Sequence, residues 1–196
     1  GEEVVEIKNY FEIYEFVKTI NKEEIVLIDS NKISYSILKN IPAGVKVVNG
    51  MNPSTKFKAQ KNSVEIENTK KAHIRDGVAV TKFMYWLKNN IGKIEITELS
   101  AADKITELRR EQGKFIEESF GTIAGYASNG AIIHYSVTKE SNTTLKDRGL
   151  FLLDSGGQYF DGTTDITRTF ALGELTKEEK YHFTTGMFVA SKKLHN

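Results

Sequence analysis

The sequence feature that most restricts the fold is a pair of β-leaning segments on either side of Asp161-Gly162. An Asp-Gly pair between such segments is a strong signal for a two-residue hairpin turn, which here places Thr169 opposite Asp154. Since alternate residues of a strand share a face, Asp154 and Asp165 are predicted to lie on the same face. The four-residue offset between them corresponds to ~13 Å on a regular ladder. Gly156-Gly157 is the point at which a bulge would shorten that distance.

Two carboxylates on one sheet face repel each other and are costly to bury unless something neutralises them. A divalent cation resolves both problems, and hard oxygen ligands favour Mg, Mn, Ca or Zn over copper. Thr167 follows Asp165 by two residues and shares its face, so its hydroxyl is expected to hold a ligand or a bound water in place. The alternative is that both aspartates are ordinary hairpin residues, either solvated or paired with Arg168. Spacing alone leaves both interpretations open.

His134 lies twenty residues before Asp154. His134 lies within the apolar segment 131–135, which predicts a strand, and a turn over Ser128-Asn129-Gly130 joins it to another predicted strand, 120–126. A lone histidine on an apolar strand is most often a structural core residue. Beside a carboxylate metal site it could instead bind substrate or transfer protons near neutral pH.

The rest of the chain predicts an α/β fold in two domains. A polar, basic stretch over 54–62 separates a small α/β domain, 1–60, from a larger domain, 61–196. The smaller domain carries no chemically suggestive residues. Its predicted elements are a helix over 6–20, a strand over 24–29, a helix over 33–41 and a strand over 45–48.

The larger domain carries three predicted helices. Gly77 interrupts the first, which predicts a close packing contact there because glycine costs about 1 kcal/mol relative to alanine within a helix. The expected apolar faces are Ala72, Ala79, Val80, Phe83 and Leu87 in the first helix, Leu99, Ala102, Ile105 and Leu108 in the second, and Phe183, Met187, Ala190 and Leu194 in the third, which begins at a Thr176 capping box.

Composition excludes several classes of function. The 196 residues include no cysteine, which rules out disulfides, thiolate metal sites and cysteine nucleophiles. The 27 basic and 26 acidic residues leave a net charge of +1, so a phosphate-binding surface for nucleic acid is not expected. No apolar run approaches the ~18–20 residues that would span a bilayer, so no membrane partner is expected either.

Three segments of the sequence closely resemble Xaa-Pro aminopeptidases (aminopeptidase P), of the creatinase and methionine-aminopeptidase superfamily. They are Asn129-Gly130-Ala131-Ile132-Ile133-His134-Tyr135, Leu153-Asp154-Ser155-Gly156-Gly157-Gln158-Tyr159 and Asp161-Gly162-Thr163-Thr164-Asp165-Ile166-Thr167-Arg168-Thr169. The resemblance implies a partial "pita-bread" catalytic domain over 61–196, preceded by part of a creatinase-N-like α/β domain.

The resemblance also implies roles for individual residues. Asp154 and Asp165 match two ligands of a dinuclear metal centre, usually manganese, with zinc or cobalt as alternatives; Asp165 would bridge both metals. His134 matches a histidine beside the substrate that is implicated in proton transfer. The implied reaction releases the N-terminal residue of a peptide with proline at the second position. A cytoplasmic protein that forms a homodimer at full length is expected.

The family's ligand set needs one more histidine and two glutamates, and no matching motif for them occurs here. After Asp165 the remaining candidates are Glu174, Glu178, Glu179, His182 and His195. The chain is therefore expected to be a fragment that is inactive alone. The alternatives are a binding module, in which the fold holds peptides or proteins without catalysis, and a related prolidase or creatinase-type hydrolase.

Overall fold

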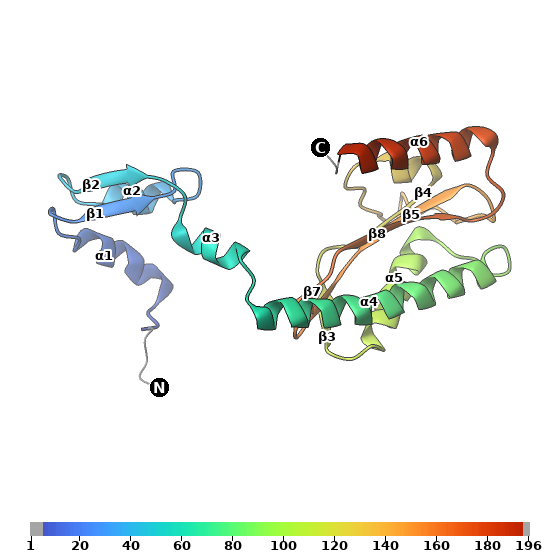
Figure 1. The fold of residues 1–196 in the computed structure, drawn as a ribbon, viewed down its shortest axis with the longest axis horizontal. Coiled ribbons are helices and arrows are strands. Elements are labelled where there is room, and N and C mark those ends of the chain that lie inside the picture. Colours follow the sequence, from blue (N-terminus) through green and yellow to red (C-terminus); the bar gives the residue numbers. More distant parts are fainter. Residues whose placement is uncertain (1–5, 194–196) are drawn as a thin grey trace. The chain divides into compact units, whose positions relative to one another are not determined.

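The chain divides into two compact units, one ending at Lys61 and the other beginning at Asn62 (Figure 1). The structure is a computed structural model, and it describes the backbone of residues 6–193 and the side chains of residues 6–186. Among these residues, no helix combines the length and the apolar character needed to span a bilayer.

The first unit contains a two-stranded parallel sheet flanked by short helices. The strands β1 and β2 pair from Ile25↔Lys46 to Ile28↔Asn49, at the two positions where the apolar runs predict strands. The helix α3 was not predicted, because the polar stretch over 54–62, which contains most of it, was interpreted as the boundary between the two domains. The elements are η1 (Tyr10–Glu12), α1 (Ile13–Lys18), β1 (Ile25–Ile28), α2 (Tyr35–Asn40), β2 (Lys46–Asn49) and α3 (Pro53–Ala59).

The second unit combines three helices with two small antiparallel sheets. The strand orders are β3-β6-β7 and β4-β5-β8, so β8 lies at an edge of its sheet. The elements are α4 (Ser63–Asn90), α5 (Glu98–Arg110), β3 (Phe115–Glu118), β4 (Ile123–Tyr126), η2 (Ala127–Ala131), β5 (Leu150–Ser155), β6 (Gly157–Tyr159), β7 (Gly162–Thr163), β8 (Ile166–Ala171) and α6 (Lys177–Lys193).

The core of this unit lies between α4, α5 and one face of the β4-β5-β8 sheet. Phe83 of α4 packs against Phe170 of β8 with ring centroids 5.9 Å apart, and Phe170 stacks on Phe151 of β5 at 6.2 Å. Along β5 every second side chain is buried, which leaves the other side chains on the opposite face. Figure 1 shows α6 on that opposite side of the strands.

The predicted apolar face of α4 is confirmed, because Ala72, Ala79, Val80, Phe83 and Leu87 are all buried. The predicted face of α5 is confirmed at Ile105 and Leu108, which are buried, whereas Leu99 and Ala102 are only half-buried. Glu98 and Arg109 are buried as well. Buried polar networks described below draw these two charged residues inward. The close contact expected at Gly77 is wrong, since an added Cβ there would meet no atom within 4 Å.

Candidate functional site

Asp154 and Thr167 lie opposite each other on adjacent strands. They are direct partners in the β5–β8 ladder, and the Thr167 hydroxyl donates a 2.7 Å hydrogen bond to Asp154 Oδ1. Asp154 alternates with the buried Leu153 and Ser155, so its side chain belongs to the face away from the helical core. The Thr167 hydroxyl therefore holds one oxygen of the Asp154 carboxylate on this face.

The observed register differs by two residues from the predicted one. The hairpin turns at Phe160-Asp161, and Asp154 therefore faces Thr167 rather than Thr169. Asp165 directly precedes β8, whose pairing with β5 ends at Ser155↔Ile166. Continuing the ladder by one residue would make Asp165 a diagonal neighbour of Asp154, which corresponds to ~7–8 Å between Cα atoms on a regular ladder. The two-residue shift shortens the separation expected between Asp154 and Asp165, which is the effect that a bulge at Gly156-Gly157 was expected to have. No residue is inserted there, because the β5–β8 and β6–β7 pairings keep the same register.

Contacts with α4 explain why the turn lies one residue earlier than predicted. Gly162 lies directly against this helix: a Cβ at Gly162 would be 3.0 Å from Ala72 Cβ. The Asp161 carboxylate accepts hydrogen bonds from Nη1 and Nη2 of Arg75, at 2.9 and 3.0 Å, and from Nζ of Lys114 at 2.9 Å. The glycine is thus needed for close approach to a helix and not for a turn with positive φ.

We predict that this turn makes stability sensitive to acid. Hydrogen bonds from Arg75, and then from Lys114, hold the pKa of Asp161 well below its usual value near 4. The unfolded chain therefore takes up a proton at a pH where the folded chain does not. The resulting stabilisation is present above about pH 4 and is lost as the pH falls further. Asp161→Asn should be less stable than the wild type at pH 7, and this deficit should be clearly smaller at pH 2.5. Urea unfolding at both pH values measures this, and an equal deficit at both would contradict it.

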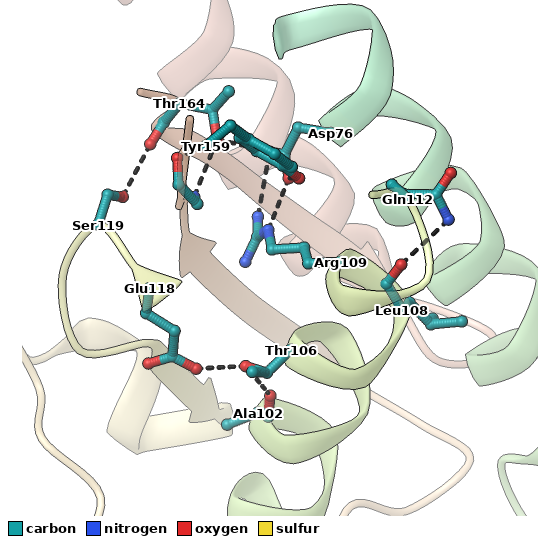
Figure 2. A network of polar contacts seen from close by, with 11 residues as sticks. Asp76, Ala102, Thr106, Leu108, Arg109, Gln112, Glu118, Ser119, Tyr159 and Thr164 are labelled. Carbon is teal, nitrogen blue, oxygen red and sulfur yellow. Dashed lines mark hydrogen bonds and ion pairs between the residues drawn. The ribbon is translucent and has the colours of Figure 1, made fainter. Parts of the chain in front are cut away.

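A buried polar network lies beneath the residue that precedes Asp165 (Figure 2). Asp76 of α4 accepts hydrogen bonds from Arg109 of α5 at 2.6 and 3.2 Å, from the Tyr159 hydroxyl at 2.8 Å and from the Thr164 hydroxyl at 3.0 Å. The Ser119 hydroxyl donates to the Thr164 carbonyl oxygen at 2.8 Å. Both the side chain and the backbone of Thr164 are therefore fixed, which restrains the adjoining Asp165.

His134 does not lie on a strand, and the strand predicted over 131–135 is wrong. The chain forms the η2 turn and then an irregular loop, and His134 is exposed with a left-handed φ of 55°. The close packing of η2 on the sheet explains the difference: a Cβ at Gly125 would be 2.8 Å from both Cα and N of Gly130. The exposure of His134 excludes the interpretation as a buried core histidine.

This contact predicts a strong effect of a single methyl group. Gly125→Ala should displace η2 and destabilise the unit by about 1–3 kcal/mol, since the obstructing atoms belong to the backbone. Gly77→Ala is the matched control and should stabilise the protein by about 0.5–1 kcal/mol, because its site is open and helical. Urea unfolding compares them. Equal stability of the two variants would refute the packing argument.

His134 lies beside the sheet that carries Asp154, in a cavity that neither aspartate lines. A cavity of about 450 Å³ is lined by His134, Tyr135 and Ile123, among others, and by neither aspartate. Ile123 is the β4 partner of Asp154 in the ladder. Ile123 therefore lies between the two residues: it lines the cavity with His134 and pairs with Asp154 in the sheet.

The donor chemistry of Asp154 and Asp165 fits a hard divalent cation, but these two residues do not complete a site. Within the part of the chain whose side chains are described, no group of three or more His, Asp or Glu side chains is placed to hold a metal ion. The remaining candidates on α6 have local partners: Glu179 caps Thr176, and Glu178 lies 3.6 Å from His182. Glu174 is exposed, and His195 lies outside the described residues.

Sequence reasoning missed three charged residues that support this region: Asp76, Arg109 and Glu98. Each is fully buried. The available signal for Asp76 was its position within the apolar stripe of α4, where a charged residue implies a buried partner. In the predicted apolar face of the last helix, Phe183 is exposed, and the side chains of Met187, Ala190 and Leu194 lie outside the described residues.

Comparisons with known proteins agree with this arrangement. The sequence profile of metallopeptidase family M24 matches residues 67–188, and that of the creatinase/prolidase N-terminal domain matches residues 1–65. A probable Xaa-Pro aminopeptidase P of Trichophyton verrucosum is 42% identical over 153 residues, which are 77% of this chain and 22% of that protein. Xaa-Pro aminopeptidase 2 of Mus musculus is 38% identical over 181 residues, or 92% of this chain and 27% of that protein.

Solved structures confirm the predicted fold class. The X-prolyl aminopeptidase of Caenorhabditis elegans, described as a cytosolic enzyme with a di-nuclear active site, superposes with a TM-score of 0.79 at 31% identity. The match covers 86% of this chain and 29% of the nematode chain. The prolidase of Pyrococcus furiosus gives a TM-score of 0.65 at 25% identity, covering 90% of this chain and 49% of that one. The chain thus spans about a quarter of the length of its aminopeptidase relatives.

Proposed function

Because this chain belongs to metallopeptidase family M24, we propose that it is part of a metal-dependent aminopeptidase that releases an N-terminal residue preceding proline. The observation that carries the proposal is the β5–β8 register, which pairs Asp154 with Thr167, two residues after Asp165, and joins the two by a hydrogen bond. Relatives named as Xaa-Pro aminopeptidases support the substrate class.

Asp154 and Asp165 would hold two divalent metal ions, with manganese as our first choice and zinc or cobalt as alternatives. When bound, such ions polarise the scissile carbonyl and stabilise the charge that develops on its oxygen. Thr167 orients Asp154 through its hydrogen bond, and the Asp76 network restrains Asp165 through Thr164. One histidine and two glutamates would complete the set, from the portion of the relatives that this chain does not span.

His134 would bind the substrate and transfer a proton near the scissile bond. Its exposure leaves the ring accessible to a peptide, and its cavity adjoins the strand next to Asp154. A left-handed backbone in a residue other than glycine is strained, and such strain is concentrated at functional sites. The pKa of a free imidazole lies close enough to neutrality for proton transfer.

The proposal includes a cytoplasmic location, on the analogy of the nematode enzyme, and a homodimer at full length. Neither a nucleic acid nor a membrane is expected as a partner. Light scattering of the full-length protein tests the dimer directly, and a single species of monomer mass would contradict it.

The activity is tested with the full-length protein and matched peptides. With added Mn, it should release the first residue of a Xaa-Pro-Xaa tripeptide, and a chelator should abolish that release. The 196-residue chain alone should show no turnover above a chelator-treated control, because it supplies two of the five expected ligand residues. Cleavage restricted to Xaa-Pro dipeptides would favour a prolidase. Peptide binding without cleavage at full length would favour a binding module and contradict the proposal.

A further inference from the structure

Glu98, the first residue of α5, is a fully buried carboxylate surrounded by hydrogen-bond donors. It accepts from the Tyr126 backbone N–H at 2.7 Å, the Asn129 side-chain amide at 3.0 Å, the Tyr135 hydroxyl at 3.1 Å and the Thr143 backbone N–H at 3.0 Å. Among the described residues, no Lys, Arg or His lies within 4 Å of it to form an ion pair. Burying a carboxylate costs free energy unless its oxygens accept hydrogen bonds. The four donors together provide these bonds to Glu98.

The four donors come from both sides of His134. Tyr126 and Asn129 precede it, whereas Tyr135 and Thr143 follow it, so one carboxylate organises the whole segment 127–142. The loop also closes on itself there, because the Asn129 amide donates to the Tyr135 hydroxyl at 3.0 Å. Within this segment Tyr135 is buried while the adjacent His134 is exposed.

The backbone of His134 needs such support. A left-handed conformation is unfavourable for an L-residue other than glycine, and it persists only where the surroundings enforce it. Tyr135, the next residue, is held through its hydroxyl by Glu98 and by Ser141 at 3.0 Å. These contacts restrict the positions that His134 can take.

We propose that Glu98 is a positioning residue that holds His134 in its working geometry. The inference rests on the proposed function, in which His134 contacts substrate. Glu98 itself is buried and acts only through the loop. A carboxylate is required because both of its oxygens accept: the amide group of a glutamine would present N–H donors to the Tyr126 or Thr143 N–H.

A double-mutant cycle in the full-length protein tests this inference. Glu98→Gln should lower kcat for a Xaa-Pro-Xaa peptide about a hundredfold with a smaller change in KM, because a displacement of ~1 Å is enough to cost that much. In a His134→Ala background the same substitution should have almost no further effect. Glu95→Gln is the matched control, since Glu95 is exposed three residues earlier, and it should leave kcat unchanged.

Hydrogen exchange measured by mass spectrometry gives a readout independent of turnover. Glu98→Gln should accelerate exchange within 127–142, and Glu95→Gln should not. If Glu98→Gln prevents folding, Tyr135→Phe removes one hydroxyl from the carboxylate. It should lower kcat about tenfold with His134 present and not in its absence.

The outcomes separate the inference from the proposed function. Equal losses from Glu98→Gln with and without His134 would make Glu98 a general stabiliser and overturn the inference, as would unchanged kcat and exchange in an active protein. Full activity of His134→Ala would overturn the role of His134 and the inference with it. Absence of Xaa-Pro cleavage by the wild-type protein would instead refute the proposed function, whereas faster exchange in Glu98→Gln would still support the control of the loop.

Discussion

Asp165→Ala should abolish peptide release by the full-length protein, with a loss of kcat of at least about a thousandfold. In the proposed function Asp165 would help to compensate the charge of the metal ions, which would contribute several kcal/mol to catalysis. Bound metal should be lost together with turnover, because the remaining ligands would face two cations with less negative charge. Elemental analysis and steady-state kinetics on the same sample measure both quantities.

Asp161→Asn is the matched control for that experiment. It removes a carboxylate from the turn of the same hairpin, where the partners are Arg75 and Lys114. This variant should lose stability but retain its metal content and its kcat per folded molecule. Retention of metal and activity by Asp165→Ala would show that Asp165 is an ordinary hairpin residue.

Asp76→Ala should destabilise the second unit by about 3–5 kcal/mol, the largest effect on stability expected for a single substitution in this chain. The substitution leaves Arg109 charged, fully buried and without its carboxylate, and it removes the acceptor for Tyr159 and Thr164. Urea unfolding followed by the fluorescence of Trp86, which packs against the core of this unit, measures the change.

Two further variants make the test of the Asp76 network specific. Glu111→Ala breaks the Lys82–Glu111 ion pair, whose side chains are 48% and 46% exposed, and should cost no more than about 1 kcal/mol. Asp76→Ala combined with Arg109→Met should be more stable than Asp76→Ala alone, since no unpaired charge is then buried. Asp76→Ala and Glu111→Ala with the same stability would contradict the importance of the buried network.

The sequence by itself determined the local elements and the chemistry of the candidate site. The strands β1, β2 and β4, the strands of the hairpin and the buried face of α4 follow from apolar periodicity, because each element must bury one face whatever lies opposite. The strand β3 was not predicted. The motifs that contain Asp154, Asp165 and His134 indicate the family by themselves, and the family profile matches the segment that contains them. Residue types and their spacing carry this information locally.

Tertiary structure decided the hairpin register and the conformation around His134. The turn lies at Phe160-Asp161, one residue earlier than predicted, because α4 packs against Gly162 and binds Asp161. The loop that contains His134 is organised by hydrogen bonds to the buried Glu98. These contacts join residues 28–90 positions apart in the chain, which no local pattern encodes. The register nevertheless slipped by two residues, not one. Since side chains alternate with a period of two, a slip of two preserves the face of every residue, and the predicted face of Asp154 therefore survived an incorrect register.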